Sequence, residues 1–215
     1  MPQRRSGRPW AAALAPTPGR FLVNAPGMQA AKTSAGHGGT SRGRVAVAAF
    51  DARVDAFFEA HLRGHKGIDL VMYGASALGE HSFVWLLLSG AKAWRTRAGW
   101  GKLISAGGLL AAESVLVNGI IKSFFRRRRP EPVAPRPLPL RTPRSSSFPS
   151  GHASAAFFSA ALLRGTGRKW PLYALAIVVS TSRVHVKIHH ASDVVGGAVF
   201  GAALGEAVRR RRRLS

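Results

Sequence analysis

The chain has 215 residues, enough for one domain of ordinary size, and it combines a net charge of +23 with a hydrophobic share of 46%. A basic excess of this size indicates an anionic partner, which nucleic acid, acidic lipid headgroups or a phosphorylated substrate would each provide. The sequence contains no cysteine, which excludes disulfides and thiolate-ligated metals.

The basic residues gather in runs rather than along one face. Arg126–Arg129 and Arg209–Arg213 form two of these runs, whereas 103–121 and 193–208 contain almost no basic residue. Basic runs on either side of apolar segments are typical of a membrane protein with charged loops. A nucleic-acid-binding protein would interleave its cations with aromatic residues, and this sequence does not. We therefore expect membrane lipids, and no nucleic acid, as partners.

The first 63 residues divide into two parts. Residues 1–44 are rich in Pro, Gly, Ala, Arg and Ser and contain no acidic residue, which predicts a disordered basic tail. From 45 to 63 apolar residues recur near helical spacing with charged residues between them: Phe50, Val54, Phe57, Phe58 and Leu62. This pattern predicts an amphipathic helix that lies at a membrane interface.

Five candidate membrane segments follow, at 68–90, 102–121, 151–165, 170–185 and 193–208. They predict an all-α, membrane-embedded bundle of about five transmembrane helices over 45–208, with 209–215 as a basic tail. Several segments are short or contain charged residues, so a soluble helical bundle remains an alternative. Gly197, Gly201 and Gly205 favour the membrane, because a ridge of small residues lets helices pack closely in lipid. The proline-rich linker 130–149 predicts an extended loop.

The first of three chemically informative clusters starts at the end of the second segment. Lys122 and Arg129 are seven residues apart, about two helical turns, so both would project from one face of a helix that Pro130 ends. A lysine point charge beside an arginine fork suits a tetrahedral oxyanion. A basic run that contacts lipid headgroups is the alternative.

The second cluster is Pro149-Ser150-Gly151-His152, just before an apolar run. These residue types predict a helix start, where free backbone N–H groups and the positive end of the helix dipole form an anion cradle. Gly151 would let a phosphate approach the backbone closely. An ordinary helix cap with an incidental histidine is the alternative.

The third cluster lies between the last two apolar segments. His189 and Asp193 are four residues apart, so a helical turn would bring the carboxylate under the imidazole and fix its tautomer. Arg183 adds a fork of donors, and Ser192 is predicted to cap the last helix.

Two other kinds of site fit less well. A metal site at His185, His189 and Asp193 would place the cation beside Arg183 and Lys187, which would repel it. A serine hydrolase built on Ser150 would need a G-x-S-x-G nucleophile elbow, which the sequence lacks. Phosphate chemistry uses all three clusters together, although their spacing alone does not decide which histidine attacks.

The three clusters form an ordered pattern, K-x6-R-P, P-S-G-H and S-R-x5-H-x3-D, that resembles the type 2 phosphatidic acid phosphatase (PAP2) superfamily. The resemblance covers roughly 67–208. It implies a phosphatase in which His189 attacks phosphorus to form a phosphohistidine and Asp193 orients it. It further implies that His152 protonates the leaving oxygen and later activates water. No metal or other cofactor is implied, and the phosphoryl oxygens would be held by Lys122, Arg129, Ser150, Gly151 and Arg183.

Charge and topology suggest where the site lies. Lipid-acting members of that superfamily usually have six spans, whereas here we count five plus the segment 45–63. With five spans, the face opposite the clusters carries a large basic set: Lys92, Arg95, Arg97, Lys102, Arg164, Arg168, Lys169 and Arg209–Arg213. The positive-inside rule makes that face cytoplasmic, so we expect a plasma-membrane protein with an extracytoplasmic site. The basic N-terminal tail argues for the opposite orientation.

The expected substrate is a lipid phosphate or diphosphate, such as a polyprenyl phosphate or diphosphate or phosphatidic acid, whose tail stays in the membrane. A phosphatase of soluble phosphate monoesters and a non-catalytic basic membrane scaffold remain the alternatives.

Overall fold

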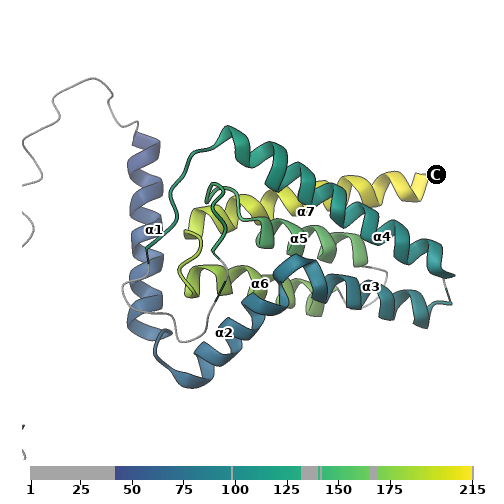
Figure 1. Ribbon diagram of the computed structural model, residues 1–215, viewed down its shortest axis with the longest axis horizontal. Coiled ribbons are helices and arrows are strands. Elements are labelled where there is room, and N and C mark those ends of the chain that lie inside the picture. The colour runs from purple at the N-terminus through teal and green to yellow at the C-terminus, as the bar shows by residue number, and fades with distance from the viewer. Residues whose placement is uncertain (1–41, 98, 132–139, 141, 165–168, 215) are drawn as a thin grey trace, which may run out of the picture. The chain divides into compact units, whose positions relative to one another are not determined.

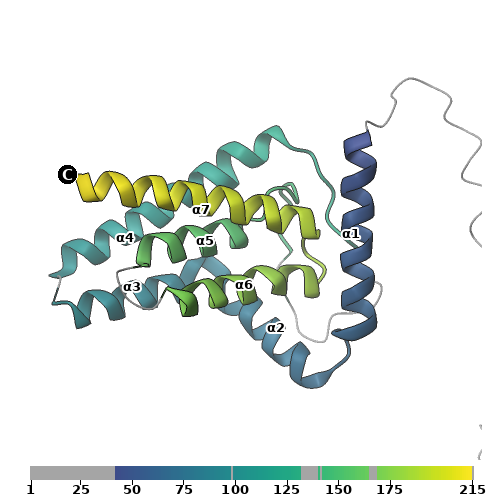
Figure 2. The ribbon, with the colours of Figure 1, turned by 180° about the vertical axis from the view of Figure 1, so that it is seen from behind.

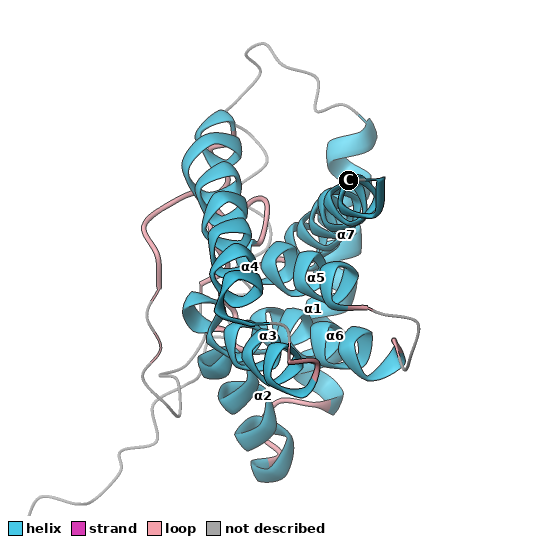
Figure 3. Cartoon of the chain, turned by 90° about the vertical axis from the view of Figure 1, so that its right-hand side faces the viewer, coloured by secondary structure: helices cyan, strands magenta, loops and turns pink. Residues whose placement is uncertain are grey.

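The computed structural model describes residues 42–97, 99–131, 140, 142–164 and 169–214, and every regular element among them is helical (Figures 1 and 3). The all-α prediction is confirmed. The longer helices are α1 (Arg42–His61), α2 (Lys66–Leu78), α3 (Phe83–Arg95), α4 (Gly99–Ser114), α5 (Gly151–Leu163), α6 (Trp170–His185) and α7 (Ala191–Leu214). A single 3₁₀ turn, η1 (Glu80–Ser82), separates α2 from α3, whereas η2 (Val115–Ile120), a π-helical turn, and η3 (Ile121–Phe124) prolong α4.

Helix α5 is the central element of the bundle, with α3, α4, α6 and α7 around it (Figure 3). Most of its residues are buried, including Ala153, Ala156 and Phe158. Its composition explains this position, because alanine, serine and glycine let neighbouring helices approach from several sides. The core cluster around it adds Trp85 and Val179 from α3 and α6.

Close contact between α5 and α7 depends on the glycine ridge. A Cβ atom at Gly197 or Gly201 would overlap the backbone oxygen of Ser150 or Ser154, and one at Gly205 would lie 2.6 Å from that of Phe158. The three glycines therefore face three carbonyls spaced one turn apart along α5. The two helices run side by side in both ribbon views (Figures 1 and 2).

Helix α1 lies across one end of the bundle, next to the loops that lead into α5 and α7 (Figures 1 and 2). Its inner face buries Phe58 against Val184, Ala191 and Val194. Its outer face leaves Phe57 54% exposed. This division agrees with the amphipathic pattern predicted for 45–63, although the helix already begins at Arg42.

The expected membrane segments are realised with differences. The segment 68–90 is broken at Gly79–Ser82 into α2 and α3. At this break Gly79 lies close to α6, where a Cβ would be 2.8 Å from Val179 Cγ1. Within the described residues, two helical stretches are long and apolar enough to cross a membrane, Gly99–Phe124 and Ala191–Arg212. The count of five spans stays a prediction.

The two terminal tails are placed differently from one another. The expected disordered tail 1–44 lies outside the described residues except for 42–44, which form the start of α1. At the other end, the basic run 209–213 continues α7, since Glu206 accepts hydrogen bonds from Arg209 and Arg210 one turn further on.

Candidate active site

A cavity of about 340 Å³ opens where the three clusters meet. Lys122, Gly151, His152, Arg183 and His189 all line it, although they come from four different parts of the chain. Its remaining polar wall is formed by Glu80, Ser82, Glu113, Ser114, Asn118 and Ser145. The structure thus brings together cations, histidines and a helix N-terminus around a single space.

The chain is extended from Phe125 onward, after the helical turns that prolong α4, so the prediction of one helix through Lys122 and Arg129 is wrong. The helix ends at Phe124, and Phe125 takes extended backbone angles of φ −119° and ψ 138°. A helix would spread four successive arginines around its axis. Extended chain instead lets residue 127 pair with the loop before α5, where Ser146 Oγ accepts the Arg127 N–H and Ser147 N donates to the Arg127 carbonyl.

The start of α5 forms as predicted. Ser150 is its N-cap, and its hydroxyl accepts the Ala153 N–H at 3.4 Å. The Ser150 N–H donates to the Asp193 carbonyl at 3.0 Å, which ties this helix start to α7. At Gly151 a Cβ atom would lie 2.5 Å from Asn118 Oδ1, so glycine is needed for the close approach of that amide.

The loop from α6 to α7 folds back on itself and brings Arg183 close to His189. The Arg183 carbonyl accepts N–H bonds from both Ile188 and His189 at 3.1 Å. Lys187 turns the chain with a positive φ of 50°, a left-handed conformation that is uncommon outside glycine. The Arg183 side chain is 1% exposed and donates to Ser76 Oγ on α2.

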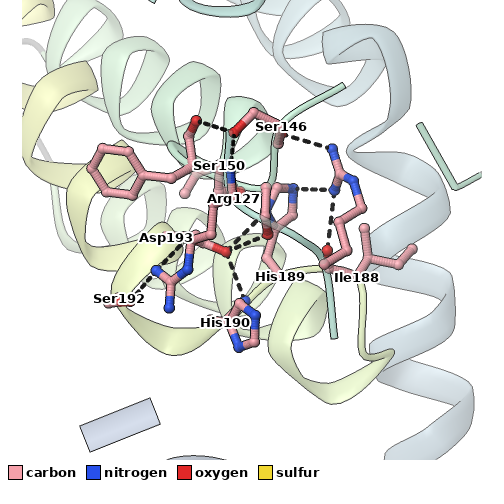
Figure 4. A network of polar contacts seen from close by, with 12 residues as sticks. Arg127, Ser146, Ser150, Ile188, His189, His190, Ser192 and Asp193 are labelled. Atoms are coloured by element: carbon pink, nitrogen blue, oxygen red, sulfur yellow. Dashed lines mark hydrogen bonds and ion pairs between the residues drawn. The ribbon is translucent and has the colours of Figure 1, made fainter. Parts of the chain in front are cut away.

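His189 is held between a cation and a carboxylate. Arg129 Nη1 lies 3.1 Å from Nε2, and Asp193 Oδ2 lies 3.6 Å from Nδ1 (Figure 4). Because a guanidinium can only donate, Nε2 carries the lone pair and Nδ1 carries the proton. The pKa of His189 is lowered to about 3, mainly by burial; the hydrogen bond with Asp193 acts in the opposite direction, and the charges of Arg129, Arg183 and Lys122 act in the same direction as burial. The imidazole is therefore neutral at physiological pH.

Asp193 is fully buried and is fixed from several sides (Figure 4). Its Oδ2 accepts the Ser147 hydroxyl and, at 2.9 Å, the His190 N–H, while its Oδ1 accepts Arg127 Nη1 at 2.7 Å. The bond to the N–H of residue 190 is the contact that an acidic side chain makes at the third position of a helix. Since α7 begins at Ala191, the prediction that Ser192 caps this helix is wrong.

A comparison with known protein families matches the part of the chain that contains the three clusters. The family model described as "PAP2 superfamily" matches residues 102–213, just over half of the chain. The chain belongs to the PAP2 superfamily.

Named relatives of this PAP2 protein are phosphatases. Decaprenylphosphoryl-5-phosphoribose phosphatase of Mycobacterium tuberculosis is 37% identical over 139 residues, which cover 63% of this chain and 75% of the relative. Phosphatidylglycerophosphatase B of Bacillus subtilis is 30% identical over 149 residues, or 62% and 70% of the two chains. The crystal structure of a transmembrane PAP2-type phosphatidylglycerolphosphate phosphatase from Bacillus subtilis matches with a TM-score of 0.57 and 26% identity, over 77% of this chain and 87% of that one. The chain is thus a phosphoric ester hydrolase of the PAP2 type.

Several polar residues of the PAP2 site were not expected from the sequence. Ser147 bridges His189 and Asp193, and Glu113, 2% exposed, accepts the Ser154 hydroxyl at the wall of the cavity. Arg127 joins Asp193 to Asp51 on α1. The acidic residue within an apolar segment was the one available signal for Glu113. No sequence signal distinguishes Arg127 from the other three arginines of the run Arg126–Arg129.

Proposed function

We propose that the chain is an integral membrane phosphatase that hydrolyses a lipid-anchored phosphate ester through a phosphohistidine on His189, without a metal. The observation that carries the proposal is the shared cavity, in which Lys122, Arg183, His152 and the start of α5 surround the neutral imidazole of His189. Among the described residues, no group of three or more His, Cys, Asp or Glu side chains is arranged to hold a metal ion.

Binding and attack are assigned as follows. The phosphoryl oxygens would be neutralised by Lys122, Arg129 and Arg183, and hydrogen-bonded by the Ser150 hydroxyl and the Gly151 backbone N–H. Entry of the phosphate would draw Arg129 from Nε2 to a phosphoryl oxygen and expose the lone pair. His189 Nε2 then forms the P–N bond while the P–O bond to the lipid breaks. The proton on Nδ1 stays directed at Asp193, which stabilises the cationic imidazole of the phosphoenzyme.

His152 is assigned to the proton transfers. It is the second residue of α5 and lines the same cavity as His189. In the first step it protonates the leaving lipid oxygen. In the second it removes a proton from water, whose oxygen attacks phosphorus and releases inorganic phosphate with the imidazole of His189 restored. Gly79 makes room for the imidazole ring of His152, because a Cβ at Gly79 would lie 3.0 Å from His152 Cδ2.

The surface supports a membrane position, for which we propose about five spans. Large apolar side chains are exposed along the bundle, including Ile104 at 72%, Val115 at 64% and Val199 at 65%. Three tryptophans, Trp94, Trp100 and Trp170, are exposed near the end of the bundle away from α1. Tryptophan is enriched where a membrane meets water, so these side chains suit the headgroup level.

Charge supports an extracytoplasmic site in the plasma membrane. Lys92 and Arg95 lie in the last turn of α3, Lys102 in the first turn of α4, Arg97 in the turn between these helices, and Arg209–Arg212 near the end of α7. These helix ends lie at the end of the bundle away from α1 (Figure 1), and Arg168, also in the expected set, lies outside the described residues. Under the positive-inside rule this basic end faces the cytoplasm.

The relatives and the proposed membrane position both support a lipid substrate. Both curated relatives have names in which the phosphate belongs to a lipid, one a polyprenyl phosphoribose and the other a phosphatidylglycerophosphate. We infer that residues 45–208 form the phosphatase domain and that its substrate keeps its tail in the bilayer. Polyprenyl-linked phosphates, including the phosphoribose and diphosphate forms, and phosphatidic acid are the candidates.

The test is phosphate release by the purified chain in detergent with EDTA. The panel contains decaprenylphosphoryl-5-phosphoribose, phosphatidylglycerophosphate, phosphatidic acid, undecaprenyl diphosphate and the water-soluble p-nitrophenyl phosphate. We expect EDTA-resistant, vanadate-inhibited turnover of a lipid substrate that is lost in His189→Ala and retained in His190→Ala. Turnover by His189→Ala would contradict the nucleophile. Turnover of only the soluble ester would contradict the lipid substrate, and no turnover of any would favour a non-catalytic scaffold.

A further inference from the structure

Asp51 is a buried carboxylate on α1, a helix most of whose residues are exposed. It lies on α1, outside the residues 102–213 that the family model matches, and it is only 7% exposed. A buried charge is costly unless it is paired and hydrogen-bonded. Asp51 Oδ1 accepts the Ser192 N–H at 2.8 Å, and Oδ2 accepts the Ser192 hydroxyl at 2.8 Å and Arg127 Nη2. Every partner of this carboxylate is thus also next to Asp193.

Arg127 connects the two carboxylates. One guanidinium nitrogen, Nη2, donates to Asp51, and the other, Nη1, donates to Asp193 at 2.7 Å and to Ser192 Oγ at 2.6 Å. Because the guanidinium is planar and its donors are fixed relative to one another, its position on Asp51 determines its position on Asp193. Asp193 in turn faces His189, so α1 is linked to the imidazole through two side chains.

The balance of charge gives this link a role in the reaction. A single cation shared between two carboxylates leaves the group with a net negative charge beside His189. If Asp51 were neutral, Arg127 would compensate Asp193 alone, and Asp193 would stabilise the cationic imidazole of the phosphoenzyme less. Binding of the phosphate would change little, since Lys122, Arg129 and Arg183 are not part of this link.

We propose that Asp51 is a positioning residue for the PAP2 reaction, acting through Arg127 on Asp193, so that α1 is an integral part of the active site. The inference rests on the proposed function, since it assumes that His189 is the nucleophile. It extends the site beyond the three sequence clusters to a helix whose outer face is apolar, with Phe50 45% and Phe57 54% exposed.

The test compares Asp51→Asn with Glu59→Gln in the full chain. Both remove one negative charge from α1, but Glu59 is 58% exposed and pairs with Arg63 and Lys187. For Asp51→Asn we expect kcat to fall about 10- to 100-fold while KM and the inhibition constant of inorganic phosphate change less than about twofold. Glu59→Gln should retain wild-type values. Arg127→Lys, which keeps the cation but loses the fork, should reproduce the Asp51→Asn pattern, and the double variant should be no slower than the slower single variant.

Three outcomes would overturn the proposal: wild-type kcat in folded Asp51→Asn, equal losses in kcat and in affinity for inorganic phosphate, or an equal loss in Glu59→Gln. If Asp51→Asn does not fold, Ser192→Ala removes one hydroxyl from the link and keeps the charges of Asp51, Arg127 and Asp193. We expect a severalfold lower kcat with unchanged inhibition by inorganic phosphate, and an unchanged kcat would overturn the link. Activity in His189→Ala would instead show that the proposed function has failed.

Discussion

The body of α5 and its N-terminal end are held by opposite means. Along the body, Gly197, Gly201 and Gly205 of α7 lie directly against the backbone of α5, and this contact is possible only because glycine has no side chain. Around the N-terminal end, hydrogen bonds join polar side chains of α1, the segment after α4, the loop before α5 and the start of α7, and the Ser150 N–H donates to the Asp193 carbonyl. The first region therefore tolerates no added atom, whereas the second tolerates no lost charge or donor. Substitutions in the two regions should separate stability from activity.

The largest expected effect is on stability, from Gly201→Ala. The new Cβ would overlap the Ser154 carbonyl oxygen, a backbone atom that cannot move without displacing α5. Overpacking of a tight contact usually costs 1–3 kcal/mol, and the rigid neighbour here places the expected loss at about 3 kcal/mol or more. Thermal unfolding in detergent measures it. A wild-type melting temperature would show that the helices are further apart than the structure has them.

The largest expected effect on activity alone comes from Asp193→Asn. Asparagine keeps the shape but presents one donor and one acceptor where Asp193 accepts from Arg127 on one side and from Ser147 and His190 on the other. If its NH₂ group faces His189, it favours the tautomer with the proton on Nε2, which cannot attack. We expect kcat to fall about 10³- to 10⁴-fold, by analogy with the loss of an orienting carboxylate in other triads. Single-turnover kinetics of the folded variant would measure this loss. A loss below tenfold would contradict the orienting role of Asp193.

Acidification should destabilise the site region through His189. Its pKa of about 3 in the folded state lies below the ordinary histidine pKa of 6.5, so between these two pH values the unfolded chain binds a proton that the folded chain does not. The free energy of unfolding should therefore rise with pH through this window and be fully gained above about 6.5. Between pH 7 and pH 4 the contribution is on the order of 3 kcal/mol. His189→Gln should lose less stability than wild type over this range, and identical pH profiles would contradict the shift.

The sequence allowed prediction of what depends on local chemistry. Ser150 is recognisable as a cap, Gly197–Gly205 as a packing ridge, and His189 and Asp193 as neighbours one turn apart, because each signal lies within a few residues. The prediction that Arg129 lies on a helix was wrong, because the spacing of Lys122 and Arg129 does not tell whether the run Arg126–Arg129 is helical or extended. The pairing of Asp51 with Arg127 joins residues 76 apart and follows only from how α1 lies across the bundle.

The smallest expected effect on stability is that of Gly108→Ala on α4, which is also the control for the glycine ridge of α7. Gly108 is exposed, and a Cβ there would meet nothing within 4 Å. Alanine should therefore stabilise the helix by about 0.5–1 kcal/mol, because it restricts the unfolded backbone without a clash. The same one-methyl change would then raise the melting temperature at Gly108 and lower it at Gly201, with phosphatase activity unchanged at Gly108. A loss of stability at both positions would mean that α4 also packs through its glycines, against a surface such as a second copy of the chain.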